Sequence, residues 1–235
     1  MTLANRKLVI MAKAPRLGSV KTRLAGNLSL RAITELYSCL LNDTIALAKA
    51  LQHVEIAIMC PESDVEDLSR SVTEVVRIVP QRGEGLAAGL TSVFAHFTNS
   101  GRQRVIAFNS DSPHLPASML EDAFDLLETC DLVAGPTQDG GYYLVGARAA
   151  HPGLFISDGM GTGNALELLL TRARALGLSV CLTNPFYDID IAADLSQLSG
   201  ELQQMPEKAP RTAKWLADWE VRGERKEFHD EDSLG

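Results

Sequence analysis

Residues 7–24, K-L-V-I-M-A-K-A-P-R-L-G-S-V-K-T-R-L, decide the fold that we expect for this chain. An apolar strand at 8–12 runs into a loop with four cations and one glycine, and the loop ends in a turn that opens a helix. A strand followed directly by a helix is the repeating pattern of α/β proteins. The stretch therefore predicts an α/β fold in which the first loop is rich in positive charge.

The rest of the chain continues this alternation. Apolar runs bounded by turn residues predict strands at 8–12, 54–59, 75–79, 105–108, 132–134 and 178–182. Apolar residues at three- and four-residue intervals predict helices at 30–51, 65–72, 86–97, 119–127 and 165–176. We therefore expect a mostly parallel, mixed sheet between layers of helices. After residue 132 the next apolar run, 142–145, follows too soon for a helical crossover, so a local antiparallel strand is expected there.

A single domain is favoured, because no repeat, linker or abrupt change of composition occurs before about residue 205. We expect residues 1–205 to form this domain and residues 206–235 to form a C-terminal helix with a frayed acidic tail. Trp215 and Trp219 would lie on that helix, where they either pack back on the sheet or form a homodimer contact.

Composition narrows the possible partners. The formal net charge of −8 argues against nucleic acid, because binding that polymer needs many Lys and Arg contacts to phosphate. No apolar stretch approaches the roughly 20 residues that cross a bilayer, and residues 1–6 lack the apolar core of a secretory signal. We therefore expect a cytoplasmic protein without a membrane span. The four cysteines form no C-x-x-C pair and are expected to be buried thiols.

The loop after the first strand is a candidate phosphate-binding loop. Gly18 allows backbone N–H groups to approach an oxyanion, and the helix start contributes its positive end. The cations that would supply charge-assisted hydrogen bonds are Lys13, Arg16, Lys21 and Arg23. The alternative is a solvated cationic face at a helix end. Because cations at a helix N-terminus are unfavourable, an anion there would relieve a local cost, which favours the phosphate interpretation.

Two acidic turns follow predicted strands. Asp111 comes after the strand at 105–108, at the carboxyl edge of the sheet where open α/β folds bind ligands. A carboxylate there can hold Mg²⁺ or Mn²⁺ while ligand phosphates complete the coordination shell; the alternative role is a cap of the following helix. Asp188 and Asp190 follow the last strand and would point to the same side of an extended backbone. Asp194 fits a cap of the next helix better than a metal ligand.

The D-G-G turn at Asp139, Gly140 and Gly141 follows the fifth strand, and it indicates either a tight hairpin or a close backbone approach to a ligand. Of the histidines only His114 lies next to a candidate site, and none has a spacing that supports a metal site. The nucleophile elbow G-x-S-x-G is absent, so covalent acyl chemistry is not expected.

Four motifs together resemble a bacterial family of glycosyltransferase-like proteins, of the type called radical-SAM/selenodomain-associated transferase. They are A-P-R-L-G-S-V-K-T-R-L-A at 14–25, S-D-S-P-H-L-P at 110–116, D-G-G-Y-Y-L-V-G at 139–146 and D-I-D-I-A-A-D-L at 188–195. The chain also looks like a distant relative of the molybdenum-cofactor and phospholactate guanylyltransferases. The resemblance implies a single-domain fold of the glycosyltransferase-A type, that is, a nucleotide-diphospho-sugar transferase fold.

The resemblance also assigns roles to residues. It places the nucleotide phosphates at Arg16, Gly18, Lys21 and Arg23, and Gln81, just after the strand at 75–79, is a further candidate for nucleotide binding. It places the metal at Asp111 and at Asp190 rather than Asp188. It places the acceptor or the sugar at Asp139, Gly140 and Gly141.

The expected function is metal-dependent transfer from a nucleotide-activated donor to a small-molecule acceptor, with Lys21 and Asp111 as the catalytic residues. The donor is either a nucleoside triphosphate, in nucleotidyl transfer, or a nucleotide sugar, in glycosyl transfer. The cationic loop favours the former and the family resemblance the latter. The alternative is a catalytically inactive nucleotide-binding or regulatory protein, because Gly85 and Gly89 stand where the family has an acid and an arginine.

Overall fold

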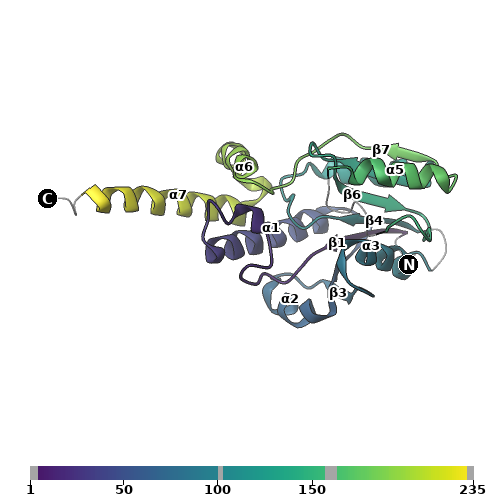
Figure 1. Ribbon diagram of the computed structural model, residues 1–235, viewed down its shortest axis with the longest axis horizontal. Coiled ribbons are helices and arrows are strands. Elements are labelled where there is room, and N and C mark those ends of the chain that lie inside the picture. Colours follow the sequence, from purple (N-terminus) through teal and green to yellow (C-terminus); the bar gives the residue numbers. More distant parts are fainter. Residues whose placement is uncertain (1–4, 100–102, 157–162, 232–235) are drawn as a thin grey trace.

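Strand β1 (Arg6–Met11) lies inside the sheet, and its apolar residues Leu8, Val9 and Ile10 are fully buried because helices cover both faces of the sheet. The computed structural model describes residues 5–99, 103–156 and 163–231, and for residues 222–231 it describes the backbone alone. Within it β1 pairs in parallel with β2 (Val54–Cys60) and with β4 (Arg104–Phe108). The carboxyl ends of these three strands therefore meet at one edge of the sheet (Figure 1).

The described strands form one seven-stranded sheet in the order β3-β2-β1-β4-β6-β5-β7. The remaining strands are β3 (Arg77–Pro80), β5 (Leu132–Pro136), β6 (Tyr142–Ala147) and β7 (Val180–Leu182). Only β6 runs antiparallel to its neighbours, β4 and β5, while β5 and β7 pair in parallel. The mostly parallel, mixed sheet and its antiparallel strand are thus confirmed.

Helices cover both faces of the sheet. Side chains alternate along β1, so that Leu8 and Ile10 face α1 (Leu30–Ala50), α2 (Val65–Ser71) and α4 (Ala117–Leu126). Val9 lies on the opposite face, in a core that includes α3 (Gly85–Phe97) and α5 (Ala165–Ala175). The chain is a single α/β domain built of three layers.

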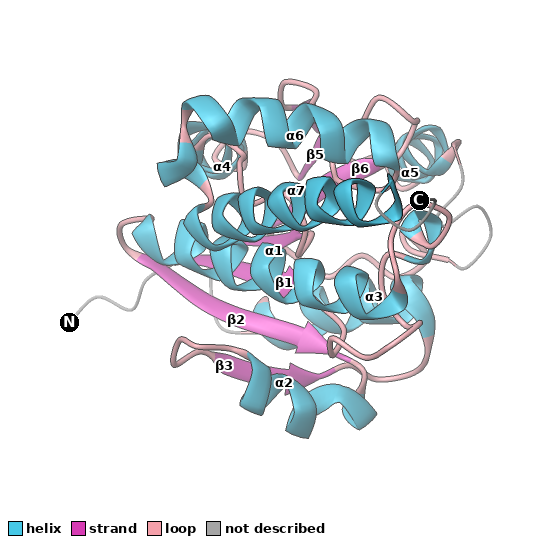
Figure 2. Ribbon diagram, turned by 90° about the vertical axis from the view of Figure 1, so that its left-hand side faces the viewer, coloured by secondary structure: helices cyan, strands magenta, loops and turns pink. Residues whose placement is uncertain are grey.

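A further helical layer packs on the outer side of α1, where Figure 2 shows α6, α7 and α1 side by side. It consists of α6 (Ala192–Gln204), the 3₁₀ turn η3 (Pro206–Lys208) and α7 (Pro210–Glu231). Trp215 is buried in this layer with Leu36 of α1 and Leu198 of α6, and Trp219 stacks on it. Trp215 and Trp219 therefore pack on helices, and the prediction that they pack on the sheet is wrong.

The buried carboxylate of Asp43 on α1 fixes the start of α7. Its Oδ2 accepts hydrogen bonds from the backbone N–H and the hydroxyl of Thr212, both at 2.8 Å. From there α7 extends beyond the sheet (Figure 1). None of the helices among the described residues is long and apolar enough to cross a membrane. The division at residue 205 stays a prediction, and the end of the tail, 232–235, lies outside the described residues.

Two local expectations are wrong. The first loop does not open an α-helix: it forms a single 3₁₀ turn, η1 (Thr22–Leu24), and α1 begins only at Leu30, where Ser29 accepts the N–H of Ala32. The cause is local, because Lys21 before the turn has a left-handed backbone, with φ 47° and ψ 40°. The loop therefore lacks the positive end of an α-helix.

The second wrong expectation concerns the cysteines. Cys130 and Cys181 form a disulfide with their Cα atoms 6.0 Å apart, while Cys39 and Cys60 are free. The pairing of β5 with β7 brings the two residues together although 51 positions separate them. Spacing along the sequence could not indicate this contact.

The turn between β5 and β6 needs glycine for a steric reason. Gly140 has φ +84°, and a Cβ atom on it would lie 1.8 Å from the carbonyl oxygen of Gly163. The carbonyl of Gly140 also accepts the N–H of Leu166 at the start of α5. The close approach in this D-G-G turn is thus to the chain's own backbone.

We predict that Gly140→Ala lowers the free energy of unfolding by about 3 kcal/mol or more, because the methyl group forces the turn away from Gly163. Gly153→Ala is the matched control: Gly153 has φ +83° and nothing within 4 Å of its Cβ position. Gly153→Ala should lower the free energy of unfolding by only about 1 kcal/mol, which is the cost of a left-handed backbone at a residue with a side chain. Urea denaturation of both variants measures the difference, and equal losses would contradict the steric explanation.

His114 is buried beneath the turn that follows β4. Its ring packs 4.8 Å from that of Phe186 and 4.5 Å from that of Tyr187, and neither ring nitrogen has a hydrogen-bond partner among the described residues. Burial lowers the pKa of His114 to about 4. The charge of Glu201 raises the pKa and that of Lys208 lowers it, and both effects are smaller than that of burial. His114 is therefore a neutral core residue.

The unfolded chain binds a proton at this histidine near pH 6.5, whereas the folded chain does so near pH 4. The stabilising effect of a neutral His114 is therefore complete above pH 6.5 and is lost as the pH falls toward 4. The free energy of unfolding of the unmodified protein should thus fall between pH 7 and pH 4. We predict that His114→Phe, which keeps the ring packing and cannot titrate, makes this fall smaller by up to about 3 kcal/mol. Unfolding curves from pH 4 to pH 7 test it; parallel profiles for both proteins would contradict the assignment.

Candidate functional site

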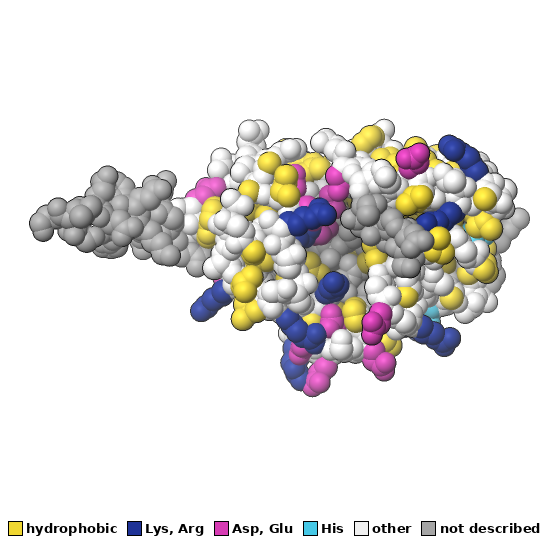
Figure 3. Space-filling view, in the orientation of Figure 1, with side chains coloured by type: hydrophobic (Ala, Val, Ile, Leu, Met, Phe, Trp, Pro, Cys, Tyr) yellow, Lys and Arg dark blue, Asp and Glu magenta, His cyan; other side chains and the backbone are white. Residues whose placement is uncertain are grey.

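A cavity of about 610 Å³ opens where the carboxyl ends of β1, β2 and β4 meet. Its lining includes five of the predicted site residues: Lys21, Arg23, Gln81, Asp111 and Asp190. Positive and negative side chains also lie close together near the middle of the face in Figure 3. This edge of an open α/β sheet is the usual location of a ligand site.

Lys21 is the central cation of the cavity. Its Nζ donates to Oδ1 of Asp190 at 2.9 Å and forms an ion pair with Oδ2 of Asp111, while only 6% of the side chain is exposed. Burial by itself would lower the pKa of Lys21, but the charges of Asp111 and Asp190 outweigh it and raise the pKa above its ordinary value. The ammonium is therefore charged and joins two acids that come from distant parts of the chain.

Asp111 lies in the turn after β4 and does not cap a helix, since Pro116 is the N-cap of α4. Its Oδ1 is buried and has no hydrogen-bond partner among the described residues. A buried carboxylate oxygen without a partner is costly. It is therefore available to a further cation or donor in the cavity.

Asp188 and Asp190 follow β7 and lie close to Asp111. Asp190 also binds Nη1 of Arg23 at 3.0 Å, whereas Asp188 has no salt bridge among the described residues. Burial raises the pKa of Asp188 to about 7, and the negative charges of Asp111 and Asp190 add to the increase. Three carboxylates thus concentrate negative charge around one lysine. The N–H groups of Asp190 and Ile191 bind Asp194, which confirms its expected role as a helix cap.

Tyr37 on α1 is a site residue that the sequence did not reveal. Its buried hydroxyl accepts the N–H of Lys13 at 3.2 Å and lies 3.0 Å from Oγ of Ser110, the residue before Asp111. It joins the first loop to the turn that carries Asp111, and it lines the cavity. In the sequence Tyr37 is one more residue on the buried stripe of an amphipathic helix, so no signal distinguishes it.

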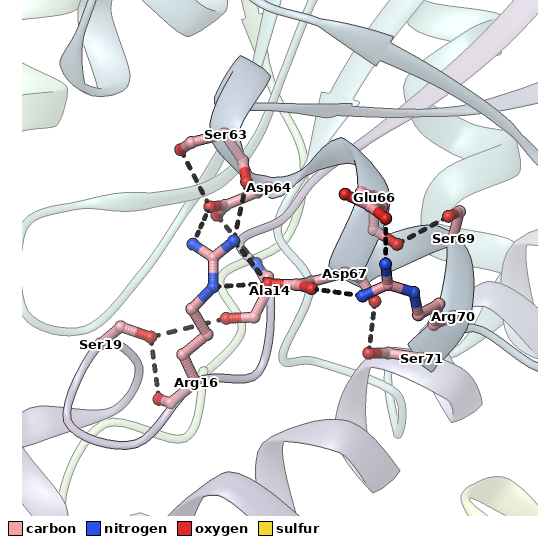
Figure 4. A network of polar contacts seen from close by, with 10 residues as sticks. All are labelled: Ala14, Arg16, Ser19, Ser63, Asp64, Glu66, Asp67, Ser69, Arg70 and Ser71. Atoms are coloured by element: carbon pink, nitrogen blue, oxygen red, sulfur yellow. Dashed lines mark hydrogen bonds and ion pairs between the residues drawn. The ribbon is translucent and has the colours of Figure 1, made fainter.

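Arg16 is not among the residues that line the cavity, and Figure 4 shows its guanidinium beside Asp64 and Asp67. Its guanidinium binds Oδ1 of Asp64, Oδ2 of Asp67 and the carbonyl oxygen of Ser63, which belong to η2 (Glu62–Asp64) and α2. Asp64 also accepts the N–H of Ala14 at 2.9 Å. Arg16 thus anchors the loop from outside, and the nucleotide contact predicted for it stays a prediction.

Gln81 lies on the far wall of the cavity, next to the start of α3. Its Nε2 donates to the carbonyl oxygens of Gly83 and Gly85, at 2.9 and 3.2 Å. A Cβ atom on Gly89 would lie 2.6 Å from Oε1 of Gln81 and 2.7 Å from Cε of Met11. Gly89 therefore has a packing reason of its own: it lets α3 approach the cavity wall.

The other predicted residues lie outside the cavity lining. Gly18 has φ +72° and open space around its Cβ position. Asp139 is held by its own turn, where Oδ1 accepts from Oγ1 of Thr137 and the N–H of Gly141. These bonds, that from Thr137 most of all, lower the pKa of Asp139, and the charge of Arg23 adds to the effect. The roles of Asp139, Gly140 and Gly141 toward an acceptor stay predictions.

The donor set fits a divalent cation that is completed by its ligand. In the part of the chain that the structure describes, no cluster of three or more His, Cys, Asp or Glu side chains forms a ready metal site. Asp111 nevertheless has a free buried oxygen, and Asp190 lies across from it. Mg²⁺ commonly binds one or two carboxylates and takes its remaining ligands from substrate phosphates and water.

Several solved structures are similar to this chain in fold. A protein of Desulfovibrio desulfuricans G20, assigned provisionally to the nucleotide-diphospho-sugar transferases, is 23% identical, covers 93% of this chain and 96% of its own, and has a TM-score of 0.84. The 4-diphosphocytidyl-2C-methyl-D-erythritol synthase of Anaerococcus prevotii DSM 20548 is 10% identical, with coverages of 86% and 98% and a TM-score of 0.56. Rv0371c of Mycobacterium tuberculosis H37Rv, solved in complex with manganese, is 15% identical, with coverages of 84% and 98% and a TM-score of 0.50.

At these identities the structures establish the fold, which is the nucleotide-diphospho-sugar transferase fold that the four motifs predicted. No curated protein matches the chain in sequence. A family model matches residues 44–162, which is just over half of the chain. The protein therefore belongs to the family described as "uncharacterized protein conserved in bacteria (DUF2064)".

Proposed function

We propose that the protein is a metal-dependent transferase that uses a nucleotide-activated donor, and that its reaction is nucleotidyl transfer to a small acceptor. One observation carries the proposal: cations of the first loop and carboxylates from two later strand ends line a single cavity. The cavity of about 610 Å³ is within the usual size range of small-molecule sites. Its charged wall suits a polyphosphate and its apolar wall, with Met11 and Leu86, suits a base.

The phosphates would bind the three cations that line the cavity, Lys13, Lys21 and Arg23. A nucleoside triphosphate carries more charge than a nucleotide sugar and releases pyrophosphate, which needs several cations around it. In the reaction an acceptor phosphate oxygen attacks the α-phosphorus, and the bond from that phosphorus to the bridging oxygen breaks. Pyrophosphate leaves with the electron pair. Lys21 would stabilise the charge that gathers on the phosphate oxygens.

Asp111 and Asp190 would hold Mg²⁺ or Mn²⁺. When bound, the metal supplies Lewis-acid stabilisation of the phosphate oxygens that gain charge. The chain's own part is to fix the acids: Tyr37 ties the turn of Asp111 to the first loop, and Asp194 accepts the backbone N–H of Asp190. Asp139 and its turn lie near Arg23, and they are the proposed acceptor side.

An inactive, nucleotide-binding protein is the competing possibility, and it rested on Gly85 and Gly89. The packing of Gly89 against Gln81 and Met11 gives that glycine a role in building the cavity. Gly85 has open space around its Cβ position, so the measurement of turnover decides between an enzyme and an inactive protein. The cytoplasmic location and a homodimer contact through the partly exposed Trp219 remain predictions from the sequence.

We predict that one nucleoside triphosphate raises the melting temperature only together with Mg²⁺ or Mn²⁺, because ligands that bind the folded state stabilise it. Asp111→Asn should lose this metal-dependent shift. Asp125→Asn, which changes an exposed acid on α4, should keep it. Differential scanning fluorimetry with four nucleoside triphosphates and their sugar diphosphate derivatives is the measurement.

Turnover then separates the two reactions. With the stabilising nucleotide and a panel of sugar phosphates, release of pyrophosphate supports nucleotidyl transfer, whereas release of a nucleoside diphosphate from a nucleotide sugar supports glycosyl transfer. If no nucleotide at millimolar concentration changes the melting temperature of the folded protein, both nucleotidyl transfer and glycosyl transfer are contradicted.

A further inference from the structure

Lys21 occupies the position between two carboxylates that a divalent cation would need. Its ammonium binds Oδ2 of Asp111 and Oδ1 of Asp190 at once, and 94% of its side chain is shielded from solvent, since 6% is exposed. Part of the negative charge of Asp111 and Asp190 is thus already offset by a side chain of the protein itself. The arrangement has a consequence for the order in which ligands bind.

We propose that Lys21 is a built-in competitor of the metal: it holds Asp111 and Asp190 in the free protein and releases them when nucleotide phosphates bind its ammonium. This inference rests on the proposed function and describes how that site is regulated. The metal then enters together with the nucleotide, and free protein binds it weakly.

Charge repulsion makes the two cations mutually exclusive. An ammonium and a divalent ion on the same pair of carboxylates would lie within a few ångströms of each other, where repulsion in a shielded cavity is severe. The ammonium also uses one oxygen of each acid, which leaves the buried Oδ1 of Asp111 as the remaining free ligand atom on that residue. A metal therefore gains both acids only after Lys21 has moved.

Lys21 has a left-handed backbone conformation, which is uncommon for a residue with a side chain. Its φ of 47° is one of two positive values among the non-glycine residues that the structure describes. Such conformations cost free energy and persist where surrounding contacts impose them. The bonds of its ammonium to Asp111 and Asp190 are among the contacts that hold this residue in place.

Metal and nucleotide should then bind with positive coupling. The nucleotide offers phosphate oxygens to Lys21 and further ligand atoms to the metal, so each partner removes an obstacle to the other. Thermodynamic linkage requires the effect to be reciprocal: the factor by which nucleotide tightens metal binding equals the factor by which metal tightens nucleotide binding.

Arg23 provides a matched comparison within the same site. It carries the same charge and binds Asp190 at 3.0 Å, but 59% of its side chain is exposed and it does not contact Asp111 in any described interaction. Its charge is screened by solvent. Removing Arg23 should therefore change metal affinity much less than removing the bridging ammonium.

The test is a titration of the ligand-free protein with Mn²⁺, in which the paramagnetic resonance signal reports the unbound Mn²⁺. Lys21→Met and Lys21→Gln should each bind Mn²⁺ about tenfold more tightly than the unmodified protein. Arg23→Met should change the affinity by no more than about twofold. Adding Asp111→Asn to Lys21→Met should abolish the gain, which locates the ion.

Unchanged or weaker Mn²⁺ binding by the folded Lys21 variants would overturn the proposal, and so would an equal gain in Arg23→Met. Circular dichroism establishes that each variant is folded. If neither Lys21 variant folds, the unmodified protein still decides the question: nucleoside triphosphate must tighten Mn²⁺ binding about tenfold or more, and no coupling would contradict the proposal. Failure of the proposed function is a separate result, in which no triphosphate binds even though Lys21→Met gains Mn²⁺ affinity.

Discussion

The ion pair of Lys21 with Asp111 and Asp190 is the interaction on which the rest of the site depends. It joins the loop after β1, the turn after β4 and the segment after β7, which are far apart in the sequence and meet only because their strands run in parallel. Each strand delivers its loop to the same edge of the sheet. The parallel arrangement of these strands therefore brings opposite charges together in one cavity.

Several features surround this ion pair and keep its members in place. Tyr37 links the first loop to the turn of Asp111, and Arg16 with Asp64 holds the outer side of that loop (Figure 4). Neither Tyr37 nor Asp64 needs to touch a ligand for this role. The cavity is thus lined by charged groups whose positions are fixed by α1 and η2, which is the preorganisation that electrostatic catalysis requires.

Periodicity in the sequence predicted the order and type of most elements, because buried strands and amphipathic helices impose distinct hydrophobic patterns. The motifs also pointed to Lys21, Arg23, Asp111 and Asp190, which line one cavity in the structure, while their roles stay predictions. Long-range contacts could not be predicted in this way. The disulfide between Cys130 and Cys181 and the salt bridges of Arg16 depend on which segments become neighbours, and that is a property of the folded chain.

The exchange of one cation for another at Asp111 and Asp190 is the central claim, and diffraction at the manganese absorption edge tests it most directly. Crystals would contain Mn²⁺ and a non-hydrolysable analogue of the nucleoside triphosphate that binds. We expect an anomalous peak between Asp111 and Asp190, with Nζ of Lys21 bound to a phosphate oxygen. A bound nucleotide with Lys21 still joining the two acids, and no manganese beside them, would contradict it.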